Sequence, residues 1–78
     1  MKTTVATAGA LLREARLRCG LTQAELARRA GVTQSVISAY ESGRRQPALT
    51  TLASLIWSAG LEMTVTLHPI RDATRSLT

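Results

Sequence analysis

Glycine recurs through this chain at short intervals, and this spacing limits what the chain can fold into. The glycines are Gly9, Gly20, Gly31, Gly43 and Gly60. With Pro47 and Pro69 added as further stops, most segments between stops are roughly 8–12 residues long, which is the length of short helices rather than long ones. With 78 residues in all, the chain is long enough for one small domain.

The first two segments carry clear helix signals. Apolar residues recur every three or four positions over residues 8–18, which predicts an amphipathic helix. A second helix is predicted to begin after Thr22, a suitable N-cap, because Glu25 follows three residues later and completes a capping box. Gly31 is predicted to end this helix.

A third helix is predicted almost immediately afterwards. Thr33 is its N-cap candidate and Gly43 ends it. Two short helices joined by a glycine-containing turn of about three or four residues are the sequence form of a helix-turn-helix. A fourth helix is predicted over residues 48–59.

The pattern changes over residues 61–70. Polar and apolar residues alternate there, β-branched residues are frequent, and Pro69 stands at the end, so the segment is predicted to be a β-strand. A strand needs a partner for its backbone groups, and no second strand is evident. We therefore expect the strand to pair with its copy across a homodimer. Residues 71–78 are expected to form a flexible tail.

Four apolar side chains are the candidates for this dimer interface. Aromatic residues are enriched at interfaces, so Trp57 of the fourth helix is predicted to belong to it. The alternative is that Trp57 folds back onto its own core. The complete set is Trp57, Met63, Val65 and Leu67.

Composition narrows the class of partner and excludes several functions. The formal charge of +5 favours a polyanion, either nucleic acid or an anionic membrane surface. The single cysteine, Cys19, cannot form an internal disulfide and completes an apolar stripe, so it is interpreted as a core residue rather than a redox sensor. His68 has no ligand-spaced partners, which argues against a metal site. No cofactor, catalytic set or membrane span is predicted, and a cytoplasmic location is expected.

Three segments together resemble the Cro/C1 (Xre) family of helix-turn-helix proteins. They are Gly20–Ala27, Ala30–Gln34 and Ile37–Pro47, and Arg16 stands where that family usually has an arginine. The resemblance covers about residues 8–60. It implies a mainly α, lambda-repressor-like domain of four to five helices over residues 1–60, followed by the dimerisation strand.

The resemblance also implies which residues face DNA. A recognition helix in the major groove needs small or hydrogen-bonding side chains on its outer face, and Gln34 is suited to a bidentate contact with adenine. The implied base-contacting residues are Thr33, Gln34, Ser35, Ser38 and Ala39. The implied phosphate-contacting residues are Gln23, Arg44, Arg45 and Arg16, with Arg13 and Lys2 as weaker candidates.

Arg16 has a second interpretation. In similar proteins the matching arginine often pairs with a glutamate at the position of Glu41, so Arg16 is expected either to form this ion pair or to contact DNA, and the two roles are compatible.

The expected function is a sequence-specific, DNA-binding transcriptional repressor that recognises a palindromic double-stranded operator as a homodimer. The C-terminal strand resembles that of HipB-like antitoxins, so the chain is also expected to bind a toxin and to repress a HipBA-like toxin–antitoxin operon. The alternative is a stand-alone Xre-type or phage-type repressor without a toxin partner.

Overall fold

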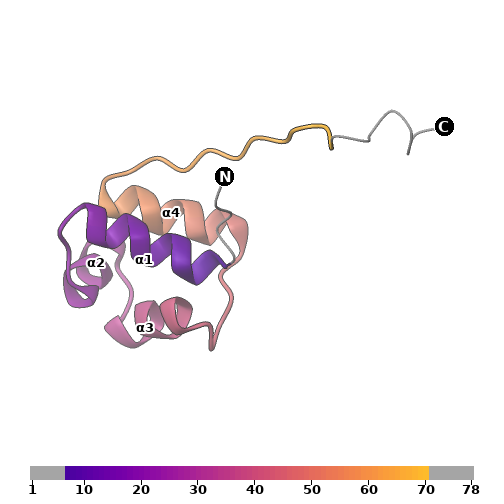
Figure 1. Ribbon diagram of the computed structural model, residues 1–78. Coiled ribbons are helices and arrows are strands. Elements are labelled where there is room, and N and C mark those ends of the chain that lie inside the picture. The colour runs from indigo at the N-terminus through magenta and orange to yellow at the C-terminus, as the bar shows by residue number, and fades with distance from the viewer. Residues whose placement is uncertain (1–6, 71–78) are drawn as a thin grey trace.

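The computed structural model describes residues 7–70, and these residues form four helices (Figure 1). All four helices lie where the glycine and capping signals predict them, so the mainly α fold is confirmed. Their bounds are α1 Ala8–Arg18, α2 Gln23–Ala30, α3 Gln34–Ser42 and α4 Leu49–Ala59.

Threonine hydroxyls cap the first three helices. Thr7 Oγ1 accepts the Ala10 N–H at 3.0 Å, and Thr33 Oγ1 accepts the Val36 N–H at 3.3 Å. At α2 the predicted capping box is complete: Thr22 Oγ1 accepts the Glu25 N–H at 3.0 Å, while Glu25 Oε1 accepts the Thr22 N–H at 2.8 Å. The bond from the Thr22 backbone lowers the pKa of Glu25 from its usual range. These caps fix where each helix starts.

The core lies where the four helices meet. Its three fully buried large side chains come from three different helices: Leu12, Leu26 and Ile37. Helix α4 closes the core with Leu52, Leu55, Ile56 and Ala59. Burying one such aliphatic side chain contributes about 1.5–3 kcal/mol, so this shared core holds α3 in a fixed position.

Gly9 lies inside α1, within the predicted helix, and is buried. A Cβ atom built on Gly9 would overlap the carbonyl oxygen of Tyr40 in α3. Gly9 therefore allows α1 to cross close to the α3 backbone. At Gly43, in contrast, a φ of 84° ends α3 in the left-handed region that favours glycine.

Residues 61–70 leave α4 as an extended segment (Figure 1). Leu61 and Met63 pack against the core, whereas Val65 is 61% exposed and Leu67 is 90% exposed. Residues 7–70 contain no strand within the single chain. The predicted strand needs a second copy to pair with, so both the strand and its pairing stay predictions.

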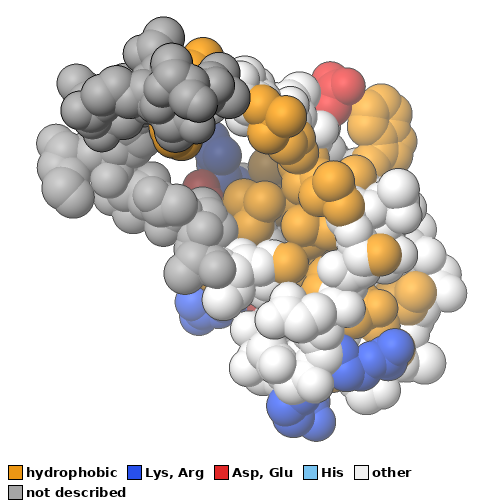
Figure 2. Space-filling model, turned by 90° about the vertical axis from the view of Figure 1, so that its right-hand side faces the viewer, with side chains coloured by type: hydrophobic (Ala, Val, Ile, Leu, Met, Phe, Trp, Pro, Cys, Tyr) orange, Lys and Arg blue, Asp and Glu red, His pale blue; other side chains and the backbone are white. Residues whose placement is uncertain are grey.

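Apolar side chains remain at the surface beside this segment. On the face shown in Figure 2 they form a band through the middle of the molecule, with basic side chains along the lower edge. Trp57 is 69% exposed, so the alternative that it folds back onto its own core is wrong. No helix among the described residues is long and apolar enough to span a membrane. Lys2 and the predicted tail, 71–78, lie outside the described residues.

Candidate nucleic-acid interface

Helix α3 presents a polar outer surface. Thr33, Gln34 and Ser35 are exposed, and Ser38 is half-buried. Thr33 Oγ1 already caps the helix and lies 3.0 Å from Ser35 Oγ, so these two hydroxyls contact each other. Gln34 therefore contributes the side-chain amide of this surface. Its NH₂ group can donate and its carbonyl oxygen can accept hydrogen bonds at a base edge.

Ala39 is more buried than the other predicted base-contacting residues. Its side chain is only 6% exposed, and its carbonyl oxygen accepts the Arg45 N–H at 3.2 Å. Helix α3 packs against both α1 and α2, and the loop after α3 folds back onto it at this hydrogen bond. Little of the Ala39 methyl group is therefore open to a base, and its assignment as a base-contacting residue stays a prediction.

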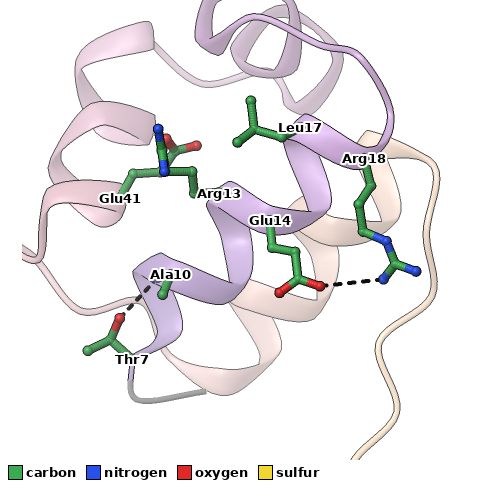
Figure 3. Close-up of a pocket in the computed structure, with 7 residues that line it drawn as sticks. All are labelled: Thr7, Ala10, Arg13, Glu14, Leu17, Arg18 and Glu41. Carbon is green, nitrogen blue, oxygen red and sulfur yellow. Dashed lines mark hydrogen bonds and ion pairs between the residues drawn. The ribbon is translucent and has the colours of Figure 1, made fainter. Parts of the chain in front are cut away.

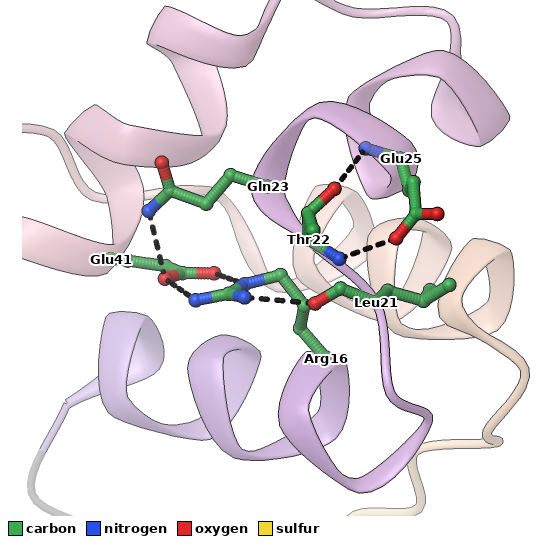
Figure 4. A network of polar contacts seen from close by, with 6 residues as sticks. All are labelled: Arg16, Leu21, Thr22, Gln23, Glu25 and Glu41. Carbon is green, nitrogen blue, oxygen red and sulfur yellow. Dashed lines mark hydrogen bonds and ion pairs between the residues drawn. The ribbon is translucent and has the colours of Figure 1, made fainter.

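A buried polar network joins α1, α2 and α3 (Figure 4). Arg16 Nε donates to Glu41 Oε2 at 2.7 Å, and Arg16 Nη2 donates to Glu41 Oε1 at 2.8 Å. Arg16 Nη1 donates to the Leu21 carbonyl oxygen at 2.9 Å. The Arg16 and Glu41 side chains are 10% and 4% exposed, so this bidentate pair is almost closed to solvent.

The network shifts the pKa values of both partners. Burial raises the pKa of Glu41, but the hydrogen bonds from Arg16 and Gln23 outweigh burial and hold that pKa below its usual range. The hydrogen bond to Glu41 raises the pKa of Arg16. The predicted ion pair is therefore present, and the Arg16 guanidinium is directed at the protein's own atoms, which leaves it little surface for phosphate.

Gln23 is the first residue of α2 and also belongs to the network. Its Nε2 donates to Glu41 Oε1 at 3.1 Å, and the residue is half-buried. The backbone N–H groups of a first helical turn lack partners within the helix and favour an anion. Glu41 thus fixes the Gln23 amide beside the start of α2, which suits the predicted phosphate contact.

Arg44 and Arg45 lie exposed in the loop after α3, as predicted for phosphate-contacting residues. Arg44 Nε donates to Ser42 Oγ at 3.1 Å. The Arg45 guanidinium carbon lies 5.4 Å from the centroid of the Tyr40 ring. This contact was not predicted from the sequence, because Tyr40 and Arg45 meet only through the turn at Gly43.

A groove runs along the outer side of α1 (Figure 3). Arg13 is exposed at this groove and extends toward Glu41, consistent with a weaker phosphate-contacting candidate. Glu14 and Arg18 form a solvent-exposed pair across one helical turn, with 3.7 Å between Oε2 and Nη1. The lining residues are Thr7, Ala10, Arg13, Glu14, Leu17, Arg18 and Glu41.

Other chemistry has no comparable arrangement in the described part of the chain. Residues 7–70 contain no cluster of three His, Cys, Asp or Glu side chains that could hold a metal ion. Cys19 packs against the core, as its place in the apolar stripe predicts.

Comparisons with known proteins agree with this arrangement. The helix-turn-helix family model matches residues 12–56, more than half of the chain. An HTH-type transcriptional regulator of Methanothermobacter thermautotrophicus, itself uncharacterised, is 46% identical over 52 residues, which are 67% of this chain and 75% of that protein.

Among solved structures, the chain is similar to HipB in a crystal form of the HipB-O1-O2 complex. The TM-score is 0.64 at 28% identity, and the match covers 85% of this chain and 99% of the HipB chain. With α2 and α3 placed as the motif requires, the chain belongs to the helix-turn-helix family of DNA-binding transcriptional regulators.

Proposed function

We propose that this protein is a sequence-specific repressor that inserts α3 into the major groove of a palindromic DNA operator. The observation that carries the proposal is the exposed polar surface of α3, which rests on a buried core and is flanked by two exposed arginines. Gln34 and Ser38 are the proposed base-reading residues, with Thr33 and Ser35 beside them. Gln23, Arg44 and Arg45 are the proposed phosphate contacts.

The acting unit in this proposal is a homodimer. Three exposed apolar side chains lie near one another in sequence: Trp57, Val65 and Leu67. A group of apolar side chains that is exposed to water favours burial in an interface. Pairing of residues 61–70 with the same residues of a second copy would satisfy their backbone groups. Two α3 helices would then read half-sites about 34 Å apart, or a multiple of this distance.

Two substitutions test the assignment of roles. Gln34→Ala should cost about 1–3 kcal/mol on the selected operator and relax specificity at one base position. Arg44→Ala should weaken binding to cognate and random DNA alike and reduce the salt slope by about 1. Arg28→Ala is the charge control, because Arg28 is an exposed arginine on α2 that is not among the proposed contacts. Equal effects of Gln34→Ala on cognate and random DNA would contradict base reading.

An antitoxin role is the second candidate, and the similarity to HipB over 99% of that chain supports it. In this role the protein neutralises a toxin by direct contact and represses the operon that they share. Co-expression with the adjacent reading frame tests this idea. Rescue of growth together with a stable complex would support the antitoxin, whereas a harmless neighbouring product would leave a stand-alone repressor.

A further inference from the structure

The two arginines that follow α3 are held in different ways. Arg44 reaches the hydroxyl of Ser42, which is itself exposed. Arg45 lies over the ring of Tyr40, with 5.4 Å between the guanidinium carbon and the ring centroid. This separation is within the range of about 6 Å over which a cation is attracted to an aromatic face. The Arg45 contact is therefore with the core, and the Arg44 contact is with the surface.

Arg45 is held through both its side chain and its backbone. Tyr40 is only 9% exposed and belongs to the hydrophobic core. The Arg45 N–H donates to the Ala39 carbonyl oxygen at 3.2 Å, after the left-handed turn at Gly43. Both the backbone of Arg45 and its guanidinium are thus fixed relative to α3. A stacked guanidinium keeps its N–H edges available for a planar or tetrahedral anion.

We propose that Tyr40 is a positioning residue, which holds Arg45 ready to contact a DNA phosphate, and that Arg44 contributes mainly its charge. This inference rests on the proposed DNA-binding function. Ordering a long side chain costs conformational entropy when it binds. Tyr40 removes part of this cost for Arg45 before DNA binds. Ser42 Oγ accepts hydrogen bonds from the backbone N–H of Arg44 at 3.4 Å and from its Nε at 3.1 Å, but Ser42 is exposed, so water competes for the bond to the Arg44 side chain.

Charge-conserving substitutions separate the two arginines. Arg45→Lys keeps the charge but loses the stacked plane, so it should weaken operator binding about three- to tenfold. The paired variant, Arg44→Lys, also changes a proposed phosphate contact but keeps its charge, so its loss should be smaller, at most about twofold. The salt slope should stay the same in both variants, because the number of cations is unchanged. Equal losses from the two lysine variants would overturn the proposal.

A double-substitution cycle then tests Tyr40 itself. Tyr40→Phe keeps the ring and should bind DNA like the wild type, whereas Tyr40→Leu should lose about as much affinity as Arg45→Lys. Combining Tyr40→Leu with Arg45→Lys should cost little more than either change alone. A general loss of structure would instead add to Arg45→Lys and Arg44→Lys equally, and that result would contradict a positioning role.

A measurement without DNA keeps the inference separable from the proposed function. In the free wild-type protein, ring current from Tyr40 should shift the Arg45 side-chain methylene NMR signals upfield, and Tyr40→Phe should preserve this shift. Absence of the shift in a wild type that binds its operator would overturn the inference alone. If Tyr40→Leu does not fold, the two lysine variants and this shift still decide. Failure of the wild type to bind any DNA would overturn the proposed function.

Discussion

The α3 side of this molecule and the side formed by α4 and residues 61–70 differ in how complete they are within one chain. On the α3 side, Arg16, Glu41 and Gln23 satisfy one another in a buried network. On the other side, Trp57 is 69% exposed and Leu67 is 90% exposed. The difference indicates that one chain is sufficient to build the proposed DNA-reading surface of α3, while the exposed apolar side chains are suited to a further partner. We propose that this partner is a second copy.

The largest expected effect is on the free energy of unfolding, through the buried Arg16–Glu41 pair of the α3 side. Glu41→Ala should lower the free energy of unfolding by about 3–5 kcal/mol, because it leaves Arg16 buried without its carboxylate. The measurement is urea unfolding at pH 7. Glu14→Ala breaks the exposed pair with Arg18 and should change stability by less than about 1 kcal/mol. Similar losses from the two variants would show that the buried network does not hold the helices together.

A smaller effect is expected where α1 crosses α3. Gly9→Ala places a methyl group against the Tyr40 carbonyl oxygen and should cost about 1–3 kcal/mol of stability, despite the better helix propensity of alanine. Thermal unfolding measures this change. Ala10→Ser, at the neighbouring exposed position, should stay within about 0.5 kcal/mol of the wild type. An unchanged melting temperature for Gly9→Ala would contradict the close crossing.

Substitutions on the side formed by α4 and residues 61–70 should weaken dimer assembly rather than folding. Trp57→Ser should raise the dimer dissociation constant by at least about tenfold, because it removes a large aromatic group from the proposed interface. Analytical ultracentrifugation over a concentration series measures this constant. Leu17→Ser removes an exposed leucine from α1 and is the control, with no expected change in the dimer. Equal behaviour of the two variants would place the interface elsewhere.

Acid should lower the stability of the folded protein when the Glu41 carboxylate takes up a proton. The pKa of Glu41 is lower in the folded protein than its usual value of 4.5, so the unfolded chain binds more protons in the acid range. The stability contributed by Glu41 is therefore present above about pH 4.5 and is lost as the pH falls through the folded pKa. Urea midpoints measured between pH 3 and 7 should show this fall, and Glu41→Gln should make it shallower. An equally steep fall in that variant would assign the acid sensitivity to other groups.

Sequence reasoning was sufficient for features that depend on neighbours in the chain. The capping box of Thr22 and Glu25 and the cap at Thr33 were predictable, because each involves groups only three residues apart. The Arg16–Glu41 pair spans α1 and α3, and it was predicted only through resemblance to a known family.

Other features depend on how the helices cross and could not be predicted. Ala39 is buried where the loop after α3 folds back and Arg45 N–H bonds its carbonyl oxygen. The need for Gly9 follows from the position of the Tyr40 carbonyl. The contact of Arg45 with Tyr40 requires the turn at Gly43. The alternating pattern of residues 61–70 predicts a strand, but its partner is outside the chain.

Selection of bound sequences from a random DNA pool by the wild-type protein tests both proposed surfaces together and most directly. If α3 reads DNA and the α4 side joins two copies, the enriched sequences should form a two-fold symmetric pair of half-sites, with centres about 10–10.5 base pairs, or a multiple, apart. An enriched single half-site without symmetry would contradict binding by a homodimer. A pool without any enrichment would contradict base reading by α3.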